Sequence, residues 1–175
     1  MKAYSHKEIE EILNTYGDTV YRMAYTQIKS KTLADDIYQD VCVKLLKQKR
    51  KIEPEEHLKA WLLRTTMNCC KDYWKSAWVQ KISWNSDTKE TLETMGAAYM
   101  ESETGFVTEC VLNLPEKYRT VIYLYYYEGY RQKEIAKLLG KKENTIASQL
   151  ARGKALLKIE LEKDKEGRYG IQGII

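Results

Sequence analysis

Apolar residues recur at helical spacing along nearly the whole chain, and this repeat constrains the fold more than any other feature. One run is Ile9, Ile12, Leu13, Tyr16, Val20 and Met23, and the next is Ile37, Val41 and Leu45. Residues three and four apart share one face of an α-helix, so each run marks a helix with one buried side. No segment alternates as a half-buried strand does, and the chain has two prolines. The sequence therefore predicts an all-α protein, and 175 residues suit two small helical domains.

Capping residues and a proline predict where the N-terminal helices begin. Ser5 with Glu8 three residues later forms a capping box, in which each side chain bonds the other residue's free backbone N–H. Thr32 followed by Asp35 gives a similar signal and predicts the start of the second helix. Pro54 predicts the start of a third helix, to about Ala77, because proline suits a first helical turn and disfavours helical geometry in the residue before it.

The polar faces of the second and third helices differ in charge. The second exposes a stripe of Asp36, Asp40, Val43 and Lys47. The third has an inner face of Leu58, Trp61, Leu62, Thr65 and Cys69, and an outer basic and polar stripe of Arg64, Asn68, Lys71 and Lys75, flanked by Tyr73, Trp74 and Trp78. Such stripes follow from helical spacing. Trp61 is expected in the core, whereas for Trp74 core packing and an exposed position are both open.

Charge and turn residues divide the chain into domains. Residues 83–105 carry one basic and five acidic residues and predict a linker, which separates an N-terminal domain of residues 1–82 from a C-terminal domain of residues 106–163 and a tail of residues 164–175. The C-terminal domain opens with a helix at Leu114-Pro115-Glu116 that ends by Gly129. Residues 121–127 favour strand by local propensity, but helical neighbours outweigh this weak preference.

The next two segments have the spacing of a helix-turn-helix. A short helix from Gln132 stops at Gly140, and a longer one runs from Glu143 to about Leu161. Ile146, Leu150 and Leu157 hold the second helix against the first, which leaves Asn144, Thr145, Ser148, Gln149, Arg152 and Lys154 outside. Residues 141–158 carry five basic residues and one acidic residue, which suits a polyanion. The pattern predicts DNA binding, with an ordinary helical hairpin as the alternative.

Several classes of function are disfavoured by the sequence. No apolar run is long enough for a transmembrane helix or a secretory signal, so the chain is expected in the cytoplasm without membrane insertion. The four cysteines lack zinc spacing and are expected to be reduced thiols, which predicts no metal and no cofactor. Neither a glycine-rich phosphate loop nor a nucleophile elbow is present, so we do not expect an enzyme.

Two groups of residues together resemble the sigma-70 family of RNA polymerase sigma factors. Residues 34–41 and 60–64 with Asn68 and Asp72 are similar to its region two. Residues 114–119, Glu134-Ile135-Ala136, Leu139-Gly140, Thr145-Ile146, Ser148, Leu150 and Arg152 are similar to its region four. Both motifs occur in the family's order and no third domain lies between them. This resemblance points to the extracytoplasmic-function group.

The resemblance implies a transcription initiation factor that joins core polymerase and reads promoter DNA. It implies that four residues of the second helix dock on the clamp helices of the polymerase's largest subunit: Asp36, Gln39, Asp40 and Val43. It also implies the flap of the polymerase and an anti-sigma protein as further partners. Asn68, Lys71, Trp74 and Lys75 would hold the melted minus-ten strand, since basic and aromatic groups stabilise unpaired bases. Asn144, Thr145, Ser148, Gln149, Arg152 and Lys154 would contact the minus-thirty-five element.

Departures from the family pattern bear on which bases are read. The family often has basic residues where this chain has Ala147 and Gln149, and a capping serine where it has Arg131. Gln149 suits adenine through a bidentate contact. Two alternatives stay open: a free-standing helix-turn-helix regulator that dimerises through its N-terminal helices, and a protein-interaction module.

Overall fold

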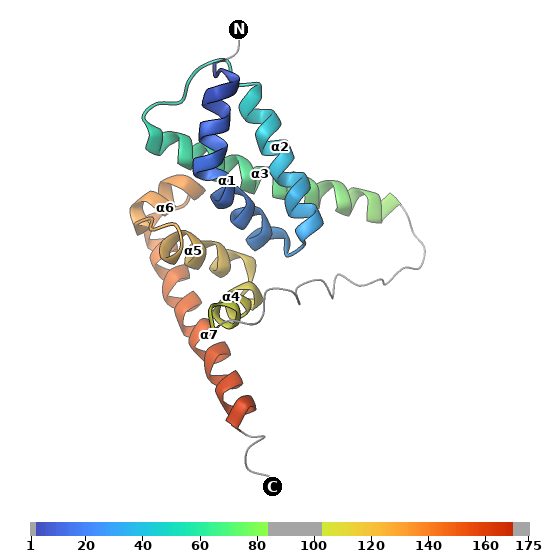
Figure 1. Cartoon of the computed structure of the whole chain (residues 1–175). Coiled ribbons are helices and arrows are strands. Elements are labelled where there is room, and N and C mark those ends of the chain that lie inside the picture. The colour runs from blue at the N-terminus through green and yellow to red at the C-terminus, as the bar shows by residue number, and fades with distance from the viewer. Residues whose placement is uncertain (1–2, 84–102, 170–175) are drawn as a thin grey trace. The chain divides into compact units, whose positions relative to one another are not determined.

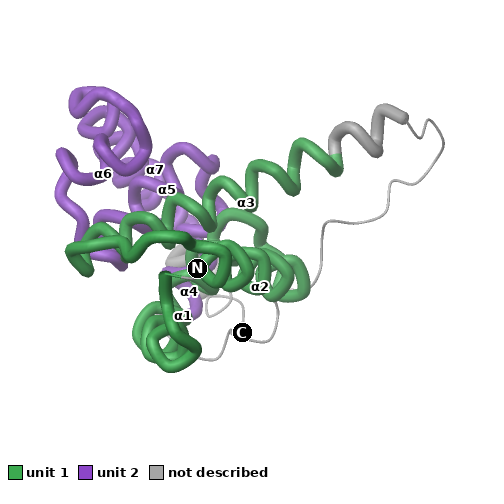
Figure 2. The backbone as a smooth tube through the Cα atoms, turned by 90° about the horizontal axis from the view of Figure 1, so that it is seen from above, with its two compact units in different colours: residues 1–97 green, residues 98–175 purple. Residues whose placement is uncertain are grey.

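The structure is a computed structural model that describes the backbone of residues 3–83 and 103–169, with side chains for residues 3–77 and 105–163 (Figure 1). The described residues form seven α-helices and no strand, which confirms the all-α prediction. Contacts divide the chain into two units, residues 1–97 and residues 98–175 (Figure 2). The two units are therefore treated separately below.

Unit 1 consists of three helices packed around one apolar core. They are α1 (His6–Ile28), α2 (Lys31–Leu46) and α3 (Glu55–Ser83). The predicted faces are confirmed, because Val20, Met23, Ile37, Val41 and Leu45 are all buried. Leu58, Leu62 and Cys69 complete the core from α3, and Trp61 packs against it while half-buried. The buried stripe of each helix thus fixes which face stays in solvent.

The first predicted capping box is present, but the second is wrong. The Glu8 carboxylate accepts the backbone N–H of Ser5 at 2.8 Å, and Ser5 Oγ accepts the N–H of Glu8 at 3.3 Å. Helix α2 begins after Ser30, whose Oγ accepts the N–H of Leu33 at 3.4 Å. Lys29 ends α1 in the left-handed region with φ of 59°, so the two helices need no further connecting residues and Thr32 lies inside α2.

Three predicted boundaries differ from the structure. Helix α3 continues to Ser83, beyond the predicted end at Ala77. Helix α4 (Glu103–Asn113) was not predicted, and its first turn lies in the range assigned to the acidic linker, of which residues 84–102 are outside the described residues. Helix α7 (Glu143–Tyr169) extends into the range assigned to the tail. The extension of α7 has no apolar repeat, because charged residues make up most of residues 162–168. In α4, by contrast, Phe106, Val107, Cys110 and Val111 do recur at helical spacing, so its sequence carried a signal that the prediction missed.

Unit 2 contains α4, α5 (Glu116–Tyr126), α6 (Gln132–Leu139) and α7. Residues 121–126 are helical despite their strand propensity, as predicted. Val121, Ile122 and Leu124 are almost completely buried, so tertiary packing outweighs local preference. The buried Arg119 side chain joins α4 to α5, since its Nη1 donates to the carbonyls of Leu112 and Leu114, both at 3.0 Å. These carbonyls lie at the end of α4 and have no partner within the helix.

The helix-turn-helix of unit 2 is confirmed. Gly140 ends α6 in the left-handed region with φ of 63°, as the sequence predicted. At the start of α6 the Glu134 carboxylate accepts the backbone N–H of Arg131 at 2.7 Å. Arg131 cannot return this bond, because a guanidinium has no acceptor. Ile146 and Leu150 of α7 are buried as expected, while Leu157 is half-buried.

Gly153 brings α7 unusually close to α5. A Cβ placed on Gly153 would lie 2.9 Å from Cγ1 of Ile122 and 3.4 Å from Cβ of Tyr118. Ile122 is buried and cannot move freely. The absence of a side chain at residue 153 therefore sets the distance between these helices.

We expect Gly153→Ala to destabilise unit 2 by roughly 1–3 kcal/mol, the usual cost of overpacking a core. The better helix propensity of alanine offsets part of this cost. Hydrogen exchange of α5 and α7 amides in the whole chain measures the effect, with Ala151→Ser on the exposed side of α7 as the control. Equal protection in the wild type and Gly153→Ala would contradict the close packing.

Candidate nucleic-acid interface

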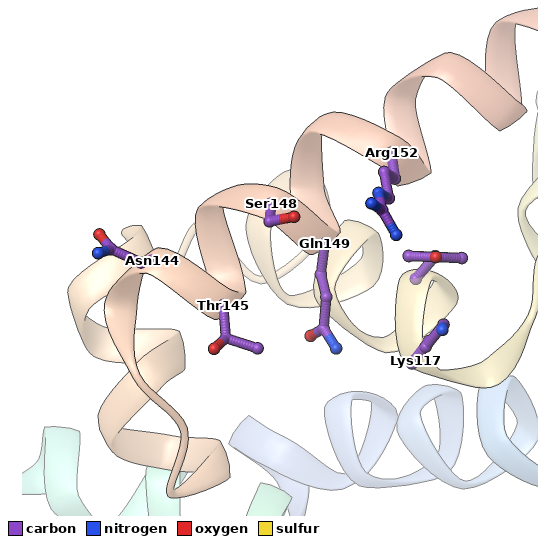
Figure 3. Close-up of a pocket in the computed structure, with 7 residues that line it drawn as sticks. Lys117, Asn144, Thr145, Ser148, Gln149 and Arg152 are labelled. Carbon is purple, nitrogen blue, oxygen red and sulfur yellow. The ribbon is translucent and has the colours of Figure 1, made fainter.

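An open concavity of about 390 Å³ lies between the first turn of α5 and the N-terminal half of α7 (Figure 3). The residues that line it are polar or cationic, with one aromatic ring: Lys117, Tyr118, Asn144, Thr145, Ser148, Gln149 and Arg152. Five of these seven were predicted from the sequence to face DNA. The structure thus brings most of the predicted site in unit 2 together on one surface.

Helical spacing explains why the α7 residues share a face. Asn144, Thr145, Ser148 and Arg152 are exposed, while Ile146 and Leu150 point into the core of unit 2. Figure 3 shows Thr145 and Gln149 extending from α7 toward the side on which Lys117 lies. The polar face therefore begins at the N-terminus of α7, where a helix-turn-helix meets base edges.

Two cations and a phenol form the basic side of the concavity. The cationic side chains of Arg152 and Lys117 favour the phenolate form of Tyr118 and so lower the pKa of its phenol. Lys117 Nζ also lies 4.9 Å from the centre of the Tyr118 ring. Arg152 of α7 and Lys117 of α5 thus both lie at the concavity with Tyr118, which concentrates positive charge suited to a phosphate or a guanine edge.

Gln149 differs from its neighbours because its side chain is half-buried. Its Oε1 atom is shielded from solvent and has no hydrogen-bond partner among the described residues. A buried acceptor without a partner is costly, so a ligand that brings a donor to it is favoured. The exocyclic amines of adenine and cytosine are such donors in the major groove.

Lys154 lies apart from the other predicted DNA contacts. Its Nζ lies 5.7 Å and 5.9 Å from the ring centres of Tyr125 and Tyr126 on α5, and it does not line the concavity. Lys154 is two positions after Arg152, so the helix rotates its side chain by about 200° from that of Arg152. Lys154 is exposed as predicted, and its contact with DNA stays a prediction.

In unit 1, α3 carries the second predicted surface. Arg64, Asn68, Lys71 and Lys75 are all exposed, as predicted. The Trp74 side chain is 40% exposed and meets the Tyr73 ring edge-on at 5.6 Å between centres. The alternative of a core position for Trp74 is thus wrong, and its ring is accessible. The side chain of Trp78 is outside the described residues.

The exposed face of α2 carries the four residues expected to dock on polymerase. Asp36, Gln39 and Asp40 are exposed, and Val43 is 43% exposed although it is apolar. Their spacing puts them on the side opposite Ile37, Val41 and Leu45. A single exposed apolar side chain is ordinary on a protein surface, so the polymerase contact of this face stays a prediction.

The described residues contain no group of three His, Cys, Asp or Glu side chains that could hold a metal ion. Three of the four cysteines, Cys69, Cys70 and Cys110, are buried, and all four are free thiols.

In the described part of the chain, no helix has both the length and the apolar character to cross a membrane.

The sequence did not identify Lys117 and Tyr118 as site residues. Both lie in the first turn of α5, about 30 residues from the helix-turn-helix face that they join. Their spacing carries no signal, because only the packing of α5 on α7 brings them to the site. The preceding Leu114-Pro115-Glu116 predicts where α5 begins but does not predict that α5 packs on α7.

Comparison with known proteins gives matches in both units. The model for sigma-70 region 2 matches residues 12–79, and the model for sigma-70 region 4 matches residues 107–157. RNA polymerase sigma factor SigV of Bacillus subtilis is 28% identical over 82% of this chain and 85% of its own length. The ECF RNA polymerase sigma factor SigM of the same organism is 26% identical over 86% of this chain and 93% of its own length.

Solved structures show the same fold. Sigma factor RpoE from Bartonella quintana, solved in complex with the anti-sigma factor NepR, has a TM-score of 0.75 and 20% identity, covering 89% of this chain and 98% of that one. CnrH, solved with the cytosolic domain of CnrY, has a TM-score of 0.64 and 20% identity, covering 91% of both chains.

We predict that Arg152→Ala raises the pKa of the Tyr118 phenol toward its ordinary value, because the substitution removes a donor that favours the phenolate. A pH titration of ¹³C-labelled tyrosine followed by NMR measures this pKa. Lys154→Ala is the matched control, since Lys154 contacts Tyr125 and Tyr126 instead. An unchanged Tyr118 titration in Arg152→Ala would show that the two side chains do not interact.

Proposed function

The chain belongs to the sigma-70 family of RNA polymerase sigma factors, in its extracytoplasmic-function group, and we propose that it directs initiation by recognising minus-thirty-five and minus-ten elements. The observation that carries this proposal is the pairing of a cationic concavity on α7 with an exposed basic and aromatic stripe on α3. Polymerase supplies the chemistry, and the factor acts with it in the cytoplasm. The functional domains are residues 1–82 and residues 106–163, with the acidic linker of residues 83–105 between them.

The concavity of unit 2 is proposed to bind the minus-thirty-five element. Asn144, Thr145 and Ser148 lie nearest the N-terminus of α7, where base edges are read. Arg152 suits the edge of guanine, and Gln149 suits adenine. Lys117 supports them from α5 as a phosphate contact. Lys154 contributes long-range charge only, because its side chain lies over the tyrosines of α5.

The stripe on α3 is proposed to hold the minus-ten strand once the duplex has opened. Lys71 and Lys75 are exposed on one side of the helix, which suits a phosphate backbone. Asn68 has a donor and an acceptor for a base edge. The accessible ring of Trp74 can stack on an unpaired base, a contact that tolerates any base because each has a π-face.

The exposed face of α2 is proposed to bind polymerase. Asp36, Gln39, Asp40 and Val43 would meet the clamp helices of the largest subunit, while unit 2 meets the flap. An anti-sigma protein is a third proposed partner, because RpoE was solved in complex with the anti-sigma factor NepR. This partner would compete with polymerase for the same factor.

Transcription with purified components tests the proposal. The protein is added to sigma-free core polymerase with the promoter of its own operon as template, and promoter-specific transcripts are expected. A free-standing regulator would instead bind duplex DNA tightly without core. If no holoenzyme forms and no specific transcript appears, the proposed function is wrong.

We expect Arg152→Ala to weaken recognition of the upstream element by about 1–3 kcal/mol, the usual discrimination from one good contact to a base edge. Competition between wild-type and altered minus-thirty-five sequences for holoenzyme measures this loss. Lys154→Ala is the control and should leave discrimination between sequences unchanged. Equal loss of promoter discrimination and core binding in Arg152→Ala would show that α7 has another role.

Asp40→Lys is predicted to weaken binding to core polymerase at least tenfold, because it places a cation on the docking face of α2. Charge reversal at a complementary interface commonly has this effect. Glu10→Lys makes the same charge change on the exposed side of α1 and should have little effect. Fluorescence anisotropy of the labelled factor with core measures both affinities, and similar values for the two variants would place the docking face elsewhere.

A further inference from the structure

Residues 3–8, here called the strap, are joined by two hydrogen bonds and an ion pair to the loop between α2 and α3. This loop, residues 47–52, is called the basic loop. The backbone N–H of Ala3 donates to the carbonyl of Gln48 at 2.9 Å, and the N–H of Ile52 donates to the Tyr4 hydroxyl at 2.7 Å. The Lys51 ammonium also pairs with the Glu8 carboxylate. More than 40 residues separate the two sides of each contact, so the loop is held at three points by a distant segment.

The strap is itself fixed in place. The Tyr4 side chain is buried in the core of unit 1 beside Ile9. Glu8 is held by Ser5, which donates to its carboxylate from both the backbone N–H and Oγ. The bonds from Lys51 and Ser5 lower the pKa of Glu8 to about 2, so the carboxylate stays ionised at neutral pH. The strap is therefore a rigid anchor for the loop.

The basic loop concentrates positive charge, and among the described residues an ion pair neutralises only Lys51. Four of its first five residues are basic, and Glu8 pairs with one of them, Lys51. Lys47, Lys49 and Arg50 are exposed and form no ion pair within the described part of the chain. Cations at a helix C-terminus offset its dipole, but this effect is lost beyond the last turn. It accounts for Lys47, which caps α2, and not for Lys49 or Arg50.

We propose that the strap holds the basic loop as a phosphate-binding surface for promoter DNA, with Tyr4 as the positioning residue. The surface needs this support because adjacent like charges repel one another and favour an extended, mobile loop. A loop fixed before binding loses less conformational entropy when it meets phosphates. The inference rests on the proposed function, since it assigns a further part of unit 1 to the same promoter.

The charge on the loop is tested by the salt dependence of holoenzyme binding to promoter DNA. Each phosphate contact releases about one counterion, so Lys49→Gln with Arg50→Gln should reduce the slope of log K against log salt by about 2. Arg22→Gln, an exposed cation on α1, is the control and should leave the slope unchanged. A slope in the double variant equal to that of the wild type would overturn the proposal.

Tyr4→Phe tests the strap, because it removes the hydroxyl that accepts the Ile52 N–H and keeps the buried ring. We expect promoter affinity to fall on the order of threefold to tenfold, the usual effect of one hydrogen bond. Exchange of the Ile52 amide should become faster, while core binding stays the same. Tyr16→Phe is the matched control, since it removes a hydroxyl that donates to Glu55 of α3 at 2.6 Å and leaves the Tyr4 bond to Ile52 in place.

A double-mutant cycle separates positioning from general destabilisation. If Tyr4 acts through the loop cations, Tyr4→Phe should cause no further loss when Lys49 and Arg50 are already glutamine. A full additional loss in that background, or a loss in Tyr16→Phe as large as in Tyr4→Phe, would overturn the role of Tyr4. Formation of wild-type holoenzyme is measured first, so failure of the proposed function is distinguishable from failure of the strap.

Discussion

Helix α7 can lie against α5 at its observed distance because residue 153 has no side chain. Ile122 occupies the space that a Cβ would need, and this contact lies at the residue next to Arg152 and beside Tyr118. The concavity depends on it, since its walls come from both helices. Arg119 adds a second restraint by bonding the carbonyls at the end of α4, which orients the first turn of α5. Lys117 and Tyr118 are thus positioned by two contacts that never touch a ligand.

In unit 1 the carboxylates expected to meet polymerase and the lysines expected to meet DNA lie on different helices. Helix α2 buries residues at intervals of four and leaves Asp36 and Asp40 outside, whereas α3 leaves Lys71 and Lys75 outside. The separation of charge is incomplete, because Asp72 is exposed beside Lys71 and, with Asp40, helps to raise the pKa of Lys44 on α2. Under the proposed function, α2 would meet polymerase while α3 meets DNA. The strap extends this arrangement, since Glu8 neutralises Lys51 and leaves Lys49 and Arg50 in solvent.

The sequence predicted features that depend on neighbours along the chain. The buried stripes, the capping box at Ser5 and the left-handed Gly140 each follow from residues within one or two helical turns. Features that depend on packing were missed or misplaced. Lys117 and Tyr118 reach the site through the α5 and α7 contact, and Lys154 lies outside the concavity, near the rings of Tyr125 and Tyr126. Ser30 replaced Thr32 as the cap because the left-handed Lys29 made the connection shorter than residue preferences suggest.

Burial gives Gln149 a different part in recognition from that of exposed Arg152. An exposed cation gains from a matching base but loses little with a mismatched one, since water solvates it in either case. The shielded Oε1 of Gln149 has no partner among the described residues, so it is already unpaired before a base arrives. A base without a donor leaves this cost unchanged, whereas a base that brings a donor relieves it without first displacing water. If α7 reads a promoter element, Gln149 therefore acts by rewarding a base with a donor, and Arg152 with Lys117 supplies the electrostatic attraction.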